Sequence, residues 1–176
     1  MGKCKNFTKD VVLTYINGAA HGGWTRTYTK FTRALTGGSE SHFDVKAVWN
    51  SIAFYNFVQS NHQFGPRESI KSIINYKDNL YDKSVGAFMS VVDSLSPDFI
   101  IVWGNTVWNV MKKNCSGIHF LNVLDSNISP SDLKQIEEYK NIPIAMKITH
   151  PSSSKFKYEN VTSLFKNIVL PSGDLD

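Results

Sequence analysis

The side chain best placed for chemistry is His150, which precedes a proline and three serines, with Lys155 directly after them. A histidine ring gains or loses its proton near neutral pH and offers both a hydrogen-bond donor and an acceptor. Pro151 restricts the backbone to a turn, and small hydroxyl residues allow a phosphate group to approach the chain closely. The stretch therefore predicts a phosphate-binding loop whose imidazole faces a pocket, and a purely structural histidine is the alternative.

Two other polar positions follow apolar segments. Asn56 comes after the apolar-rich residues 48–55, and an amide side chain can pair with a base edge as donor and acceptor. A turn-forming asparagine is the alternative interpretation of Asn56. Gly104 and Asn105 directly follow the apolar run 99–103, where a turn into a helix is expected.

Residues 99–103 form the segment around which the chain is organised. Five apolar residues without alternation predict a strand buried on both faces, and we expect it to form the middle of the sheet. Helical spacing of apolar residues before it (84–95) and after it (105–113) indicates an open parallel α/β sheet. In such sheets, ligands bind beyond the carboxyl ends of the strands.

The remaining segments predict further elements of the same kind. Residues 9–16 fit either a helix or, over 11–16, a strand, and we favour the helix. Residues 69–83 are polar and predict a loop with one helical turn. We also expect helices over 26–36, from 131 and from 158, and strands over 48–59, 117–123 and 143–149. Strands of one parallel sheet would bring Asn56, Gly104 and His150 to the same edge.

Composition sets broad limits on the protein. The chain has 176 residues, a net charge of +4 and a pI near 9.0, which is compatible with nucleic-acid binding. No apolar run approaches the length of a membrane span, and no signal peptide is evident, so we expect a cytoplasmic protein without a membrane partner. Two distant cysteines predict free thiols, with no disulfide, metal or cofactor.

Together these motifs resemble the uracil-DNA glycosylase superfamily over about residues 48–168. The resemblance rests on Ile148-Thr149-His150-Pro151-Ser152, on the strand and glycine of 97–104, on Ile52-Ala53-Phe54-Tyr55-Asn56, and on Pro66-Arg67-Glu68. It implies one three-layer α/β domain over 1–176, with a short, mainly parallel sheet between helices. Within it we expect a helical N-terminal part (1–47) and a glycosylase-like core (48–170).

The resemblance also implies roles for individual residues. Asn56 would read a flipped base, and the loop beginning at His150 would enter the DNA minor groove. His150 is then the one candidate catalytic residue. The expected nucleic-acid contacts are Asn56, Gly104, Asn105, Pro151, Ser152, Ser153 and Lys155.

The chain departs from the family at its beginning. We find no room for the family's opening strand and no glycine-rich motif with its water-activating carboxylate, since the nearest loop (18–23) has His21 and no acid. We therefore expect a non-catalytic relative that binds DNA or a nucleoprotein complex. A phage or mobile-element inhibitor of a host defence nuclease, such as an anti-CRISPR protein, is one such protein. The alternative is an active glycosylase that excises uracil or another modified base.

Overall fold

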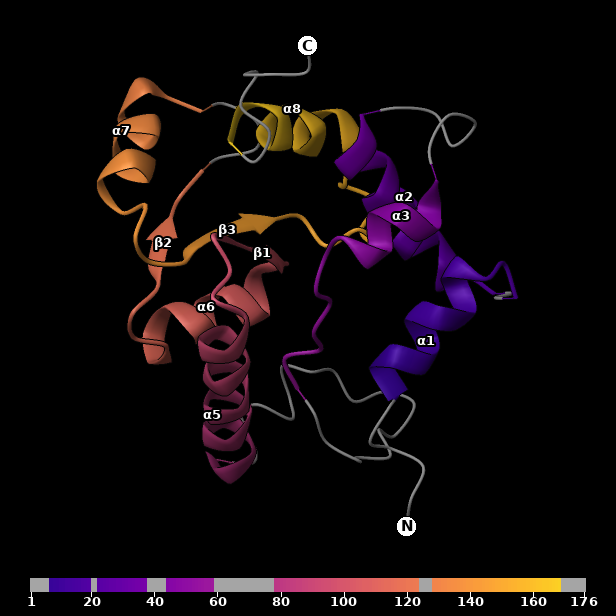
Figure 1. The fold of residues 1–176 in the computed structure, drawn as a ribbon, viewed down its shortest axis with the longest axis horizontal. Helices are drawn as coiled ribbons and strands as arrows, with labels where there is room; N and C mark the ends of the chain where they lie inside the picture. The colour runs from indigo at the N-terminus through magenta and orange to yellow at the C-terminus, as the bar shows by residue number, and fades with distance from the viewer. Residues whose placement is uncertain (1–6, 20–21, 38–43, 59–77, 124–127, 169–176) are drawn as a thin grey trace.

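A computed structural model describes residues 7–19, 22–37, 44–58, 78–123 and 128–168. Its sheet contains β1 (Phe99–Trp103), β2 (His119–Leu121) and β3 (Ile144–Ile148), in the order β1-β3-β2. Both pairings are parallel, with β1 aligned along the whole of β3 and β2 along its first half. The predicted parallel α/β sheet is confirmed (Figure 1).

The centre of the described sheet is β3, so the prediction that β1 forms its middle is wrong. Four of the five residues of β3 are buried, whereas most of β1 is only half-buried. The apolar run of β1 indicated burial on both faces, but an edge strand has a neighbour on one side only. Lys147 interrupts the apolar pattern of β3 and concealed its central position.

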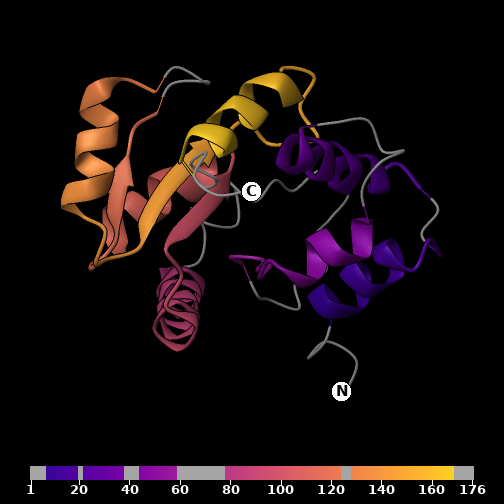
Figure 2. The ribbon, with the colours of Figure 1, turned by 45° about the horizontal axis from the view of Figure 1, so that its top comes forward.

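Helices cover both faces of this sheet. On one face lie α5 (Asp78–Leu95) and α6 (Asn105–Asn114), whose apolar residues pack with Val102 and Ala145. The other face packs with α8 (Tyr158–Ile168) and α2 (Thr25–Thr36) around Met146. A short parallel sheet between helices is thus present, and α7 (Pro130–Glu138) lies beyond β2 (Figures 1 and 2).

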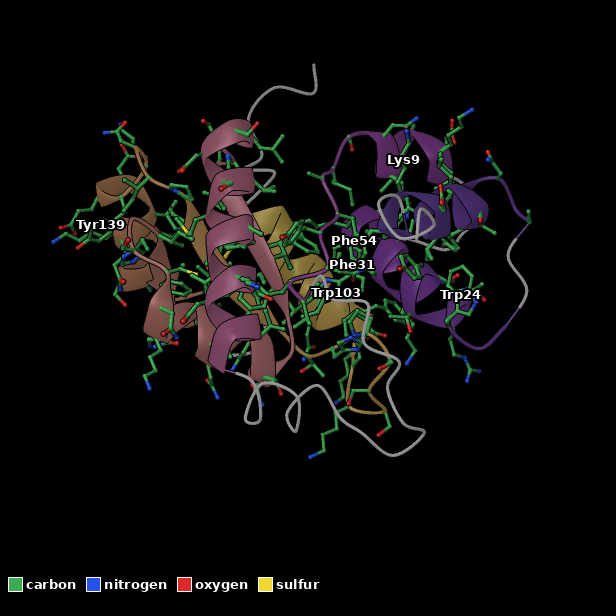
Figure 3. All side chains as sticks on the ribbon, turned by 90° about the horizontal axis from the view of Figure 1, so that it is seen from below. Lys9, Trp24, Phe31, Phe54, Trp103 and Tyr139 are labelled. Atoms are coloured by element: carbon green, nitrogen blue, oxygen red, sulfur yellow. The ribbon has the colours of Figure 1, made fainter. Side chains whose placement is uncertain are left out.

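In the described part of residues 1–50, the regular elements are helices. Helix α1 (Phe7–Ile16) confirms the helical interpretation of residues 9–16, and α2 ends at Gly37, which adopts a left-handed conformation. Figure 2 shows α1, α2 and α3 (Val45–Asn50) gathered at one side of the molecule. Aromatic rings join this group to the sheet, because Phe31 and Phe54 both pack against Trp103 (Figure 3).

The predicted strand over 48–59 is not present in the described residues 48–58. Asp44 accepts hydrogen bonds from the backbone N–H groups of Lys46 and Ala47 and so starts α3, which runs to Asn50. The residues that follow are irregular and pair with no described strand. The β-branched and aromatic side chains that indicated a strand instead pack against other side chains of the core.

One further prediction needs correction, and others fall outside the described ranges. Helix α5 begins at Asp78, within the predicted loop 69–83. The polar residues Asp82 and Lys83 indicated a loop, but they are exposed on this helix. The interpretations of His21, Pro66-Arg67-Glu68 and residues 69–77 lie outside the described residues. Among the described helices, none has the length and apolar character that a membrane span requires.

Candidate functional site

The carboxyl ends of β1 and β3 lie side by side. Trp103 aligns with Ile148, and the N–H of Gly104 donates a hydrogen bond of 2.9 Å to the Ile148 carbonyl. Gly104 has φ 86° and ψ 167°, a conformation that essentially only glycine adopts. A Cβ atom there would lie 3.5 Å from the His150 Cβ. The predicted juxtaposition of Gly104 and His150 is therefore confirmed.

The imidazole of His150 has a defined protonation pattern. The backbone N–H of Ser152 donates to Nδ1 over 3.1 Å, and the Ser152 hydroxyl lies 2.8 Å from the same nitrogen. Because a backbone N–H can only donate, Nδ1 is an acceptor and the proton of the neutral ring is on Nε2. His150 is exposed as a residue, yet partial burial of its ring lowers its pKa below 6.5 and favours the neutral form.

One nitrogen of this ring remains available. No described residue forms a hydrogen bond with Nε2 of His150. The ring is held edge-on to Trp103, with the ring centres 5.7 Å apart and the planes at 86°. The structure therefore presents a fixed, neutral N–H donor beside the end of β1.

The loop after His150 is fixed by its own contacts. Pro151 is fully buried, and Phe156 is 7% exposed. The Ser153 N–H donates to the His150 carbonyl, and the Ser153 hydroxyl accepts from the N–H of Lys155. We expected Ser152 and Ser153 to contact nucleic acid, and in the structure each hydroxyl has an internal partner that shapes the loop. Lys155 itself is exposed.

Two contributors to this edge were missed by the sequence analysis. Lys30 of α2 donates to the Ser153 carbonyl over 3.4 Å, and its ammonium lies 6.0 Å from the centre of the Phe156 ring. Trp103 was interpreted only as a strand residue, although it packs against His150. A contact between residues 30 and 153 spans most of the chain, so no local pattern indicates it.

Asn105 begins α6, and its side chain is exposed. The first N–H groups of a helix have no partner within the helix, and they carry partial positive charge. These groups follow directly after Gly104, so they add donors to the edge that His150 occupies.

We predicted that Asn56 would lie at this edge, but the structure places it elsewhere. It ends no strand, and its Nδ2 donates to the Thr8 hydroxyl of α1 over 2.8 Å. Within the same segment Phe54 packs against Trp103, whereas Tyr55 and Phe57 pack against Phe88 of α5. The segment thus lies between the two faces of the core, and only β1 and β3 bring their predicted residues together.

A shallow cavity of about 340 Å³ lies elsewhere, between the end of α2 and α8. It is lined by Gly37, Tyr158, Glu159, Thr162, Ser163 and Lys166. None of the predicted site residues borders it. The edge around His150 is therefore better described as an exposed surface than as part of that cavity.

No protein-family model, no curated protein and no solved structure matches this chain. Backbone N–H groups, the Nε2–H of His150 and nearby lysines are all hydrogen-bond donors or cations, which suits an anionic ligand.

Proposed function

We propose that this protein is a non-catalytic, glycosylase-like protein that binds nucleic acid through the edge formed by Gly104, the start of α6 and the loop 150–157. The observation that carries the proposal is the ring of His150. Its Nδ1 accepts from Ser152, and its Nε2–H has no partner among the described residues. A neutral donor of this kind suits a phosphate oxygen or a base carbonyl.

Charge supports the same partner. Lys155 and Lys157 are exposed and form no ion pair with any described carboxylate. The nearest helix start adds partial positive charge beside Gly104. Phosphate contacts from such groups supply most of the affinity in binding that is not sequence-specific.

The non-catalytic part of the proposal rests on the carboxylates. Hydrolysis of a glycosidic bond needs a base within hydrogen-bond reach of the attacking water. Asp10 lies on α1, Asp44 starts α3, and Asp98 precedes β1 at the opposite end of the sheet. No described carboxylate forms a hydrogen bond or ion pair with Gly104, His150 or the loop 150–157.

An active glycosylase is the second candidate, and the donor of His150 favours it. A histidine N–H can stabilise the anion of a departing base, and one such donor is worth roughly 2.7–4 kcal/mol in other enzymes. Release of uracil from single-stranded DNA by the wild-type protein, and its loss in His150→Ala, would support this candidate over the first.

The binding proposal is tested with a fluorescently labelled oligonucleotide at increasing salt. We expect the double variant Lys155→Gln/Lys157→Gln to bind a single-stranded oligonucleotide more weakly. If both lysines contact phosphates, the slope of log affinity against log salt should become shallower by about 1.4. Lys112→Gln/Lys113→Gln is the matched control. It removes the same charge from the last turn of α6, at the other end of that helix.

Two results would contradict the binding proposal. If the wild-type protein is not retained by nucleic acid even at low salt, the loop serves a protein partner instead. If both double variants lose affinity equally, binding follows net charge and not the edge around His150.

A further inference from the structure

Helix α2 carries a stripe of basic residues on one side. Arg26, Lys30 and Arg33 are four and three positions apart, which places them on one face, and α2 contains no acidic residue. Phe31, Thr32 and Ala34, which lie on other sides of the helix, are buried. Since a helix rises 1.5 Å per residue, the stripe extends about 10 Å along α2.

This stripe continues from the edge around His150. Lys30 reaches the Ser153 carbonyl, so the middle of the stripe touches the loop that also carries Lys155. Neither Arg26 nor Lys30 forms an ion pair with a described carboxylate. Arg26 and Lys30 therefore place two cations without a described acidic partner between the loop 150–157 and the first turns of α2.

An exposed tryptophan lies just before the start of α2. Trp24 is 40% exposed, whereas Trp49 and Trp108 are almost completely buried. Its ring packs edge-on against Tyr28, with the centres 5.5 Å apart, and Tyr28 packs in turn against Trp103. Trp24 is thus anchored to the core but remains accessible, and Figure 3 shows it at the outer side of the N-terminal helices.

We propose that Trp24 and the basic stripe of α2 form a track for single-stranded nucleic acid that extends the edge around His150. The phosphates would follow Arg26 and Lys30, and an unpaired base would stack on Trp24. A basic groove combined with an aromatic ring is how proteins bind single strands, because every base has a flat face. Bases of a duplex are already stacked on each other, so the track favours single strands. This inference rests on the proposed function.

The inference is tested by titrating the full chain with oligo-dT and with a duplex of equal length. We expect oligo-dT to quench the tryptophan fluorescence and Trp24→Phe to remove most of that quenching. Trp24→Ala should weaken oligo-dT binding by about tenfold and change duplex binding little, since base stacking on an aromatic ring contributes substantially per base. Thermal melting of both variants shows whether they remain folded.

The charge contribution is tested with Arg26→Gln, because Arg26 is exposed and does not touch the loop. Loss of one phosphate contact should reduce the salt slope by about 0.7 on a single strand. Lys134→Gln, an exposed lysine on α7, is the matched control and should leave the slope unchanged.

The outcomes separate this inference from the proposed function. If Lys155→Gln/Lys157→Gln weakens binding while Trp24→Ala and Arg26→Gln do not, the track is wrong and the proposed function stands. The track would also be wrong if the wild-type protein bound single strand and duplex with equal affinity and Trp24→Ala weakened both equally. If the wild-type protein binds neither oligonucleotide, both proposals are wrong.

Discussion

The two faces of the sheet are built from different residues. The face toward α2 and α8 is rich in aromatic rings, and Phe31 and Phe54 both pack against Trp103 there. The face toward α5 and α6 contains mainly aliphatic residues around Met111, and Trp108 is its one tryptophan. The aromatic face contacts the ring of His150 directly, because Trp103 packs against it, whereas the other face reaches the candidate site through the start of α6.

This difference separates stability from function. A substitution on the α5 and α6 face should change the stability of the fold and leave the ring of His150 undisturbed. A substitution on the aromatic face should change both, since Lys30 of α2 and Trp103 of β1 each contact the loop or its histidine.

The largest effect is expected from a buried charge in β3. Met146 is fully buried in the central strand, so Met146→Asp should unfold the protein, because an unpaired buried charge costs several kcal/mol out of a total stability of roughly 5–15 kcal/mol. Ile101→Asp in the half-buried β1 should destabilise less. Urea unfolding measures both. A greater loss from Ile101→Asp would contradict the central place of β3.

Replacing one tryptophan on each face comes next. Trp103→Ala and Trp108→Ala should each cost about 3–5 kcal/mol, as large aromatic residues do when removed from a core. Trp108 is the more buried of the two and packs against Phe120. The milder Trp103→Phe should weaken oligonucleotide binding, whereas Trp108→Phe should destabilise without changing the affinity of the folded protein. Equal affinities for the two phenylalanine variants would break the distinction between the faces.

Much of the core was predictable because its signals are local. The apolar run of β1, the glycine after it and the helical spacing of α6 lie within one short stretch, and β3 leads directly to His150. The parallel sheet then brings Gly104 and His150 together. These are the parts of the candidate site that sequence reasoning placed correctly.

The parts that failed depend on distant contacts. Residues 48–50 continue a helix that Asp44 starts, and the Trp49 indole donates to the Thr32 hydroxyl over 2.9 Å, which ties α3 to α2. Strand propensity in 48–59 was outweighed by that cap and that bond. Likewise, the contact of Lys30 with the loop and the bond of Asn56 to Thr8 join segments with no common local pattern.

A smaller effect is expected at glycines. Gly104→Ala should cost about 1–3 kcal/mol, because the backbone conformation there is strained for any other residue even though a Cβ has space beside His150. Gly86→Ala on the exposed side of α5 should instead stabilise by about 0.4–1 kcal/mol, since a Cβ there meets nothing within 4 Å. Thermal melting compares the two. A neutral Gly104→Ala would show that the turn after β1 adopts another conformation.

The smallest effect concerns the pH dependence of stability through His150. Burial lowers the pKa of the folded ring below its unfolded value near 6.5, so between these two values the unfolded chain binds more protons. The contribution of the neutral ring is complete above about pH 6.5 and is lost as the pH falls through the folded pKa. The difference in unfolding free energy between the wild-type protein and His150→Gln should therefore become smaller, or change sign, as the pH is lowered from neutral.

Trp103→Phe extends the same argument to the aromatic face. Trp103 covers one side of the His150 ring, so a smaller ring there should raise the pKa of His150 toward its ordinary value. Trp108→Phe, on the other face, should leave that pKa unchanged. Titration of the His150 ring by NMR measures the pKa in each variant directly. If the two variants shift the pKa of His150 equally, its desolvation comes from the loop and not from the aromatic face, and the link between core and site is lost.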